Sequence, residues 1–373
     1  MPEVKKVLIV GGGIAGLSLA VFLRDRGIAA DLVEIKKEWT VYGVGIIQQS
    51  NVVRAMAQLG LLDSYLKSSF SFDNVGIYDM AGNLKAKVPG RRLAGPQYPA
   101  NLGISRPALH EILTSAARSR GTQVRLGVTV ATLEQDGEFV HATLTDGSKS
   151  FYDLVVGADG IYSKVRGMVS PDAPKPRFTG QAVWRYNFPR PPEIDHLAAF
   201  NGPDRSAGLV PLSKELMYMY VTSFEPGNPW MPEDRLHLLM QERIQQFGGW
   251  IGELRPRITD PAKVVYKPME TVMVPAPWFR GRVVLIGDAA HSATPHLGQG
   301  AGIAIEDALV LGEELNSSGP IETRLERFMK RRFERCKYVV ERSAQLGEWQ
   351  MQGVSVDNGK IVDEMLEITS QPI

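Results

Sequence analysis

The chain is poor in cysteine and carries no surplus of charge of either sign. Its 373 residues include one cysteine, Cys336, which excludes an internal disulfide and a CxxC-type redox pair. With 42 basic and 41 acidic side chains, the composition offers no electrostatic case for nucleic-acid binding. The apolar stretch near the start is too short and too interrupted by glycine to span a membrane, and no signal peptide is expected. A cytoplasmic protein without a membrane anchor is therefore predicted.

Basic residues gather at only one place. Lys330, Arg331, Arg332 and Arg335 are interrupted by Phe333 and Glu334, so this stretch is interpreted as a solvated helix face. The length allows two domains, and 44% hydrophobic residues is ordinary for a globular protein.

The first glycine-rich motif follows an apolar strand near the start of the chain. Gly11, Gly13 and Gly16 have G-x-G-x-x-G spacing and lead through Ile14 and Ala15 into an apolar helix. In such a βαβ unit the first glycine makes the tight turn, the second lets the backbone approach a pyrophosphate, and the third packs helix on strand. Glu34 ends the next strand, about 20 residues further on, where an acid binds a ribose hydroxyl. The motif predicts a dinucleotide site but accepts NAD as readily as FAD.

A second segment, residues 282–308 with the sequence RVVLIGDAAHSATPHLGQGAGIAIEDA, indicates which dinucleotide binds. Asp288 stands at the carboxyl end of an apolar strand, where its carboxylate can accept hydrogen bonds from ribityl or ribose hydroxyls. Gly298 and Gly300 allow the backbone to approach a flat ring, and a helix entering through Ala301 directs its N–H groups toward that ring. This order favours a flavin, so FAD is the predicted cofactor.

A third strand-and-turn motif runs from Tyr152 to Arg166. Asp159 can order its loop or contact a ribose, and Arg166 can meet a phosphate or form a local ion pair. Both alternatives stay open for each residue.

With these three motifs the chain resembles the single-component FAD-dependent aromatic hydroxylases, the group A flavoprotein monooxygenases, which include para-hydroxybenzoate, salicylate and hydroxynicotinate hydroxylases. A GVGI turn containing Gly45 and the segment SRPALHEIL extend the resemblance over nearly the whole chain. It implies cofactor roles that run from the adenine end to the flavin ring: Val130 near the adenine, Glu34 on the adenosine ribose, Arg106 at the ribityl or pyrophosphate region, Asp288 on the ribityl chain, and Pro295, Gly298 and Gly300 beside the isoalloxazine.

The resemblance also implies an α/β fold with two interleaved domains. We expect a Rossmann-like FAD-binding domain from residues 1–70, 101–171 and 276–320, and an inserted mixed β-sheet substrate domain from 71–100 and 172–275. Residues 321–373 would form C-terminal helices, which pack on the chain's own flavin domain or on the partner of a homodimer. No second G-x-G-x-x-G is present, so NADH or NADPH would reach the flavin as a transient co-substrate at an open surface.

In this family, flavin reduced by NADH or NADPH reacts with O2 to give a C4a-hydroperoxide, which transfers OH to an electron-rich ring. Pro295 would place a backbone carbonyl near the flavin, and His296 is either a proton relay or substrate contact, or a histidine bonded within the flavin loop. His291 is interpreted as structural. No metal site is predicted.

Candidate substrate residues come from the alternating strands and the GVGI turn. Arg185 should face away from Trp184 and Tyr186, whereas Tyr218 and Tyr220 should share a face. Tyr218 is also a candidate for catalysis. Arg205 would pair with a substrate carboxylate if it turned inward, and Gln48 and Gln49 would reach the pocket from the flavin side.

The predicted function is hydroxylation of a small aromatic or N-heteroaromatic compound. Two alternatives remain: an epoxidase or hydroxylase of a larger polycyclic substrate, and a flavin-binding protein without oxygenase turnover.

Overall fold

A largely parallel sheet forms the centre of the larger core. The computed structural model describes residues 4–39, 43–354 and 358–373. Six strands lie in the order β18-β19-β12-β1-β2-β8, and only β18 and β19 are antiparallel to each other. Their bounds are β1 Lys6–Val10, β2 Ala29–Glu34, β8 Gln123–Leu126, β12 Leu154–Gly157, β18 Phe279–Arg280 and β19 Val283–Leu285. Val7, Leu8 and Ile9 are fully buried, which explains why β1 is a continuous apolar run.

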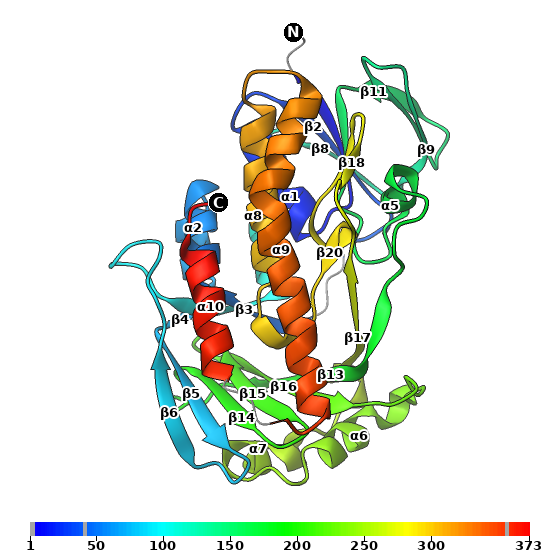
Figure 1. Ribbon diagram of the computed structural model, residues 1–373. Coiled ribbons are helices and arrows are strands. Elements are labelled where there is room, and N and C mark those ends of the chain that lie inside the picture. Colours follow the sequence, from blue (N-terminus) through cyan, green and yellow to red (C-terminus); the bar gives the residue numbers. More distant parts are fainter. Residues whose placement is uncertain (1–3, 40–42, 355–357) are drawn as a thin grey trace.

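Helices pack against this sheet. The helix that follows the first motif, α1, contacts α4 and α8, and α8 in turn contacts α9, which runs beside it and ends against the second large sheet (Figure 1). The helix bounds are α1 Ile14–Arg24, α2 Ser50–Gln58, α3 Leu62–Lys67, α4 Arg106–Ser119, α5 Lys164–Val169, α8 Gly300–Leu315, α9 Ile321–Met351 and α10 Asn358–Ser370. A three-stranded sheet, β11-β10-β9, packs buried residues into the same core; its strands are β9 Val130–Gln135, β10 Val140–Leu144 and β11 Lys149–Tyr152.

The second large sheet has eight strands in the order β20-β17-β13-β16-β15-β14-β5-β6. Its strands are β5 Asn74–Asp79, β6 Leu84–Pro89, β13 Arg177–Pro189, β14 Leu197–Asn201, β15 Ser206–Pro211, β16 Leu216–Phe224, β17 Val265–Met273 and β20 His291–Ser292. One face, which includes Trp184 and Met219, packs with α6 Leu236–Arg243 and α7 Gly249–Leu254 in a separate core. Because β20 pairs with β17 and follows β19 closely in the chain, this sheet is joined directly to the six-stranded sheet.

A small antiparallel sheet, β3-β7-β4, connects the two layers. It consists of β3 Gly45–Gln49, β4 Ser69–Phe72 and β7 Asn101–Ser105. A Cβ on Gly103 would lie 2.0 Å from the Pro211 carbonyl oxygen, so β7 packs against the end of β15 without room for a side chain. The remaining elements are single 3-10 turns: η1 Glu233–Arg235, η2 Arg255–Arg257, η3 Pro261–Lys263, η4 Gly287–Ala289 and η5 Pro295–Leu297.

The predicted α/β class, with mixed sheets and C-terminal helices, is confirmed. The prediction of a solvated basic face at 330–335 is wrong in part: Arg332 is fully buried and Arg335 nearly so, because both form ion pairs with acids of α8. In the part of the chain that the structure describes, no helix combines the length and apolar character needed to cross a membrane.

Candidate functional site

The first motif forms a turn that only glycine fits. Gly11 has a φ of +113°, and a Cβ there would lie 2.3 Å from the Ala158 carbonyl oxygen. A Cβ on Gly16 would lie 2.1 Å from the Gly11 carbonyl oxygen, so α1 rests directly on the turn. Gly13, by contrast, borders open space, and no side chain caps the start of α1. The backbone at this helix end is therefore accessible to an anionic group.

Glu34 lies beside this turn at the end of β2. Its carboxylate accepts hydrogen bonds from the Gly12 N–H at 2.9 Å and the Lys36 N–H at 3.0 Å. The Val128 N–H donates to the Glu34 carbonyl, and Val130, which begins β9, is buried in the core. The carboxylate is thus held next to the glycine turn.

The segment after β19 meets the first motif. A Cβ on Gly287 would lie 3.0 Å from the Ala15 Cβ, so this turn packs on the start of α1, beside Ile14. Asp288 is exposed, yet burial raises the pKa of its carboxyl, although the nearby charges of His291 and Arg106 act to lower it. The exposed surface of Asp288 and the raised pKa of its carboxyl are compatible if the carboxylate faces a space that is enclosed by the surrounding protein. Among the described residues it accepts no hydrogen bond.

Residues 295–301 continue from this turn into α8. Gly298 adopts the left-handed conformation, with a φ of +65°, directly after η5. Gly300 borders open space, and no side chain caps the start of α8, which begins at Gly300 and Ala301. The Leu297 carbonyl is fixed by the Gln49 side-chain N–H at 3.0 Å. A second helix end with accessible backbone is therefore held in the same segment as Asp288.

Asp159 has a structural task in this arrangement. Its carboxylate accepts bonds from the Ser163 hydroxyl and from the Lys164 and Val165 N–H groups at the start of α5. Of the two predicted roles, these contacts support loop ordering, and the ribose contact stays a prediction. The buried Arg166 donates to the Ala289 and Ile161 carbonyls and so ties this loop to the Asp288 turn.

Three predicted residues meet on the face of the eight-stranded sheet opposite to the core that contains α6 and α7. Arg185 pairs across β13 and β16 with Tyr220, whereas the adjacent Trp184 lies in the opposite core. Tyr218 and Tyr220 have ring centroids 6.3 Å apart. A Cβ on Gly45 would lie 2.4 Å from the Tyr218 ring, so the GVGI turn packs on this face.

Charge links this face to Asp288. Burial lowers the pKa of Arg185 to about 10, opposed by Tyr218 and reinforced by the positive charge of Arg106. Arg106, the first residue of α4, is near both Arg185 and Asp288, because its charge also acts to lower the pKa of Asp288. Burial raises the pKa of Tyr218 and of Tyr220, which keeps both phenols protonated as hydrogen-bond donors.

Gln48 and Arg205 were predicted to contact substrate, and the structure places both elsewhere. Gln48 is fully buried and accepts the Tyr65 hydroxyl at 3.0 Å, because in β3 it faces opposite to Gly45. Its neighbour Ile47 packs with the Tyr218 cluster instead. The Arg205 guanidinium donates to Asp204 at 2.8 and 2.7 Å and to the Arg243 carbonyl, so its charge is already neutralised outside this face.

His296 is the middle residue of η5, and its side chain lies against α9. Its Nδ1 is 2.9 Å from the Thr294 hydroxyl oxygen, and burial lowers its pKa to about 4. Its Nε2 is buried and makes no hydrogen bond of normal geometry among the described residues, although the Gln350 side chain lies close enough to oppose the lowering of the pKa. A Cβ on Gly347 would lie 2.8 Å from the imidazole, so the helix admits the ring only because that residue is glycine. Pro295 itself is exposed.

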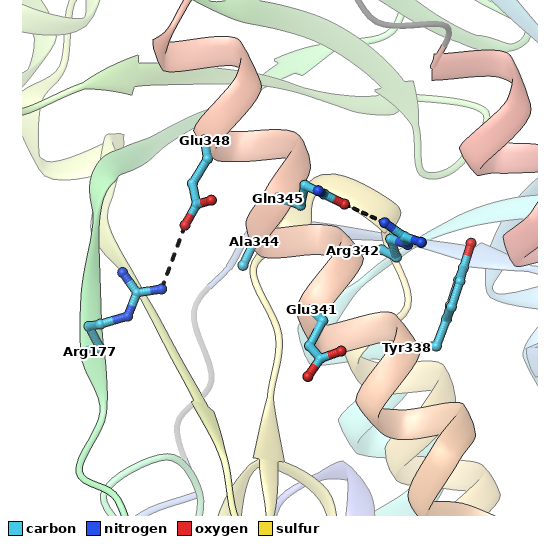
Figure 2. Close-up of a pocket in the computed structure, with 7 residues that line it drawn as sticks. All are labelled: Arg177, Tyr338, Glu341, Arg342, Ala344, Gln345 and Glu348. Atoms are coloured by element: carbon cyan, nitrogen blue, oxygen red, sulfur yellow. Dashed lines mark hydrogen bonds and ion pairs between the residues drawn. The ribbon is translucent and has the colours of Figure 1, made fainter.

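Gln49, which was predicted with Gln48, hydrogen-bonds to the 295–299 loop. The sequence reasoning missed Asn51 and Gln299, which hydrogen-bond to each other. A groove of about 480 Å³ lies between β13 and α9, and Figure 2 shows Arg177 paired with Glu348 there. None of the predicted site residues lines it.

The chain has extensive similarity to known proteins. The FAD binding domain family matches residues 5–343. The "Putative FAD-dependent monooxygenase YetM" of Bacillus subtilis (strain 168) is 32% identical over 351 residues, 94% of this chain and 95% of YetM. The 2-heptyl-3-hydroxy-4(1H)-quinolone synthase of Pseudomonas aeruginosa (strain UCBPP-PA14) is 33% identical over 352 residues, 92% of this chain and 90% of the synthase. The crystal structure of Klebsiella pneumoniae HpxO complexed with FAD and uric acid matches with a TM-score of 0.87 at 26% identity, covering 99% of this chain and 97% of HpxO.

Proposed function

The chain belongs to the FAD binding domain family as an FAD-dependent monooxygenase, and from this premise we propose that it uses NADH or NADPH to hydroxylate a small aromatic or N-heteroaromatic compound bearing an anionic group. The observation that carries the proposal is the position of Arg185: it is largely withdrawn from solvent, lies on the same sheet face as Tyr218, and has no acidic partner among the described residues. The 71–100 and 172–275 segments, which supply most of the eight-stranded sheet, would form the substrate domain.

The residues present fit FAD. The uncapped start of α1 with open space at Gly13 suits the pyrophosphate, and Glu34 beside that turn suits the adenosine ribose. Asp288, exposed and without a hydrogen-bond partner among the described residues, has free acceptors for ribityl hydroxyls. The uncapped start of α8 at Gly300 suits the pyrimidine edge of the isoalloxazine. When bound, the flavin accepts reducing equivalents from NAD(P)H and activates O2.

Arg185 supports an anionic substrate. No carboxylate pairs with it in the described part of the chain, and Arg106 adds a second positive charge nearby. A desolvated cation without a partner gains several kilocalories per mole when an anion binds it. A phenolate, an enolate or a carboxylate on the substrate would supply that anion. The urate bound by HpxO and the quinolone named for the Pseudomonas relative are both N-heteroaromatic, which supports the ring class.

Tyr218 and His296 would handle hydrogen bonds and protons. Because burial keeps the Tyr218 phenol protonated, it would donate a hydrogen bond to the substrate rather than act as a base. His296 is neutral at pH 7, since its pKa is about 4, and its Nε2 makes no hydrogen bond of normal geometry among the described residues. It would therefore relay a proton through a water or the substrate, while Pro295 borders the flavin.

The test compares matched pairs of compounds, such as a hydroxybenzoate and its neutral amide, in NAD(P)H oxidation and O2 uptake with peroxide followed in parallel. We expect anionic members to stimulate oxidation with little peroxide and to lose that effect in Arg185→Met. Equal stimulation by neutral members would contradict the assigned role of Arg185, and stimulation by larger polycyclic compounds alone would contradict the small substrate.

A further inference from the structure

Two consecutive acids lie fully buried inside α8. Glu306 and Asp307 interrupt the apolar run GIAIEDALVL, and neither side chain has any exposed surface. Arg332 of α9, also fully buried, bonds both: its Nε donates to Asp307 at 2.8 Å, and one terminal nitrogen donates to Glu306 at 2.9 Å. A buried ion pair is often no more stable than an apolar replacement of similar size, so stability alone does not explain why charges lie here.

From Asp307, hydrogen bonds lead to the Asp288 turn. Its Oδ2 accepts the Gly287 N–H at 2.9 Å and lies 2.5 Å from the His291 Nε2. These two residues flank Asp288 in the sequence. Burial by itself lowers the pKa of His291, but the Asp307 carboxylate and the Cys336 side chain act against burial and raise that pKa well above the ordinary value. The carboxylate thus fixes the turn on both sides of the proposed ribityl ligand.

From Glu306, hydrogen bonds lead to the loop at 295–299. Its Oε1 accepts the Asn51 side-chain N–H at 3.1 Å, and Asn51 exchanges two hydrogen bonds with Gln299, at 3.0 and 3.2 Å. Gln299 then donates to Gln49, whose own N–H donates to the Leu297 carbonyl. Asn51 and Gln299 are both buried, so these bonds lie out of water, where they are stronger.

We propose that Arg332, Glu306 and Asp307 form a positioning network with two arms, in which Asp307 fixes the turn of the ribityl ligand and Glu306 fixes the loop beside the isoalloxazine. The inference rests on the proposed function only in assigning Asp288 and the 295–300 segment to FAD. None of the three residues touches the reacting atoms. Asp307 acts through the Gly287 N–H and the His291 imidazole. Glu306 acts through the side-chain amides of Asn51 and Gln299.

The experiment separates the two arms with Asp307→Asn and Glu306→Gln, and Glu314→Gln serves as the matched control. Glu314 is also a buried acid of α8 that pairs with arginines of α9, Arg327 and Arg331, but it is not part of either arm. The readouts are the FAD dissociation constant and the visible circular dichroism of the bound flavin, neither of which requires substrate. Because Asp307→Asn alters a buried ion pair and could fail to fold, His291→Gln and Asn51→Ala probe the same arms with the arginine pairs intact.

We expect Asp307→Asn and His291→Gln to weaken FAD binding about 10-fold to 100-fold, since each removes a charge-assisted hydrogen bond that holds the turn. Glu306→Gln and Asn51→Ala should change the circular dichroism of the flavin with less than about a 3-fold change in the dissociation constant. Glu314→Gln should change neither. The network is refuted if all variants shift both readouts in parallel, or if His291→Gln and Asn51→Ala match the wild type. Failure of the FAD assignment is separate: Asp288→Ala would then bind FAD like the wild type.

Discussion

Replacing Arg185 by methionine should stabilise the substrate-free protein and impair its activity. Burial lowers the pKa of Arg185 from 12.5 to about 10, and one pKa unit is worth about 1.4 kcal/mol, so holding this charge in place costs about 3 kcal/mol. Because the folded-state pKa is depressed, the penalty is present at neutral pH and is relieved only above pH 10. Methionine keeps the apolar stem without the charge.

We therefore expect Arg185→Met to raise the free energy of unfolding by about 1–3 kcal/mol, the lower figure allowing for imperfect packing of the new side chain. Urea unfolding of the substrate-free enzyme measures this gain. The KM for an anionic substrate should rise at least about 10-fold in the same variant, because a charge-assisted hydrogen bond is lost.

Arg205→Met is the matched control. Arg205 is paired with Asp204 at a part-exposed position, so its loss should lower stability by less than about 1 kcal/mol and leave KM unchanged. If Arg185→Met is less stable than the wild type, or if its KM for anionic substrates is unaltered, the guanidinium is not an uncompensated charge awaiting a ligand.

Three further changes test other parts of the site. Asp288→Ala should lower FAD retention, measured as bound flavin after gel filtration; because burial raises the pKa of Asp288, FAD affinity in the wild type should begin to fall on acidification at a higher pH than for an ordinary aspartate. Gly11→Ala should abolish FAD binding or folding, since its Cβ would lie 2.3 Å from the Ala158 oxygen at a φ of +113°, and an alanine variant with normal flavin content would contradict that geometry. The pKa of His296 is depressed to about 4 from 6.5, so the unfolded chain binds more protons and stability is lost as pH falls from 6.5 toward 4. In His296→Gln, the decrease in the free energy of unfolding between pH 7 and 4.5, measured by urea unfolding, should be smaller than in the wild type by about 2–3 kcal/mol. The same decrease in the variant and the wild type would show that the imidazole is not desolvated.

The nucleotide-binding elements could be predicted because their local sequence determines their geometry. A glycine at +113° beside a carbonyl, an acid ending β2 and an acid following β19 each leave a pattern in a short window. Alternation in β13 and β16 likewise predicted that Arg185 would face away from Trp184. These features require no knowledge of distant contacts.

Errors arose where a distant partner decides a side chain's role. Arg205 and Arg185 look alike in sequence, but only Arg205 has an adjacent aspartate whose carboxylate takes its charge. Gln48 and Gln49 were both placed within reach of the pocket, but neighbouring residues of β3 point to opposite faces, and Gln48 is buried against Tyr65. Arg332 was read as exposed because its partners, Glu306 and Asp307, precede it by more than 20 residues. Glu306 and Asp307 could have indicated that a basic residue such as Arg332 is buried, since two carboxylates within an apolar helix need buried partners.

Isotopically labelled dioxygen offers the most direct test that this chain is a monooxygenase acting on an anionic ring. Purified protein loaded with FAD would be incubated with NAD(P)H, labelled O2 and the best substrate from the matched pairs, and the product analysed by mass spectrometry. We predict a product that carries one labelled oxygen atom, formed in proportion to the NAD(P)H consumed. An unlabelled product, or consumption of NAD(P)H matched entirely by peroxide with every compound, would contradict this.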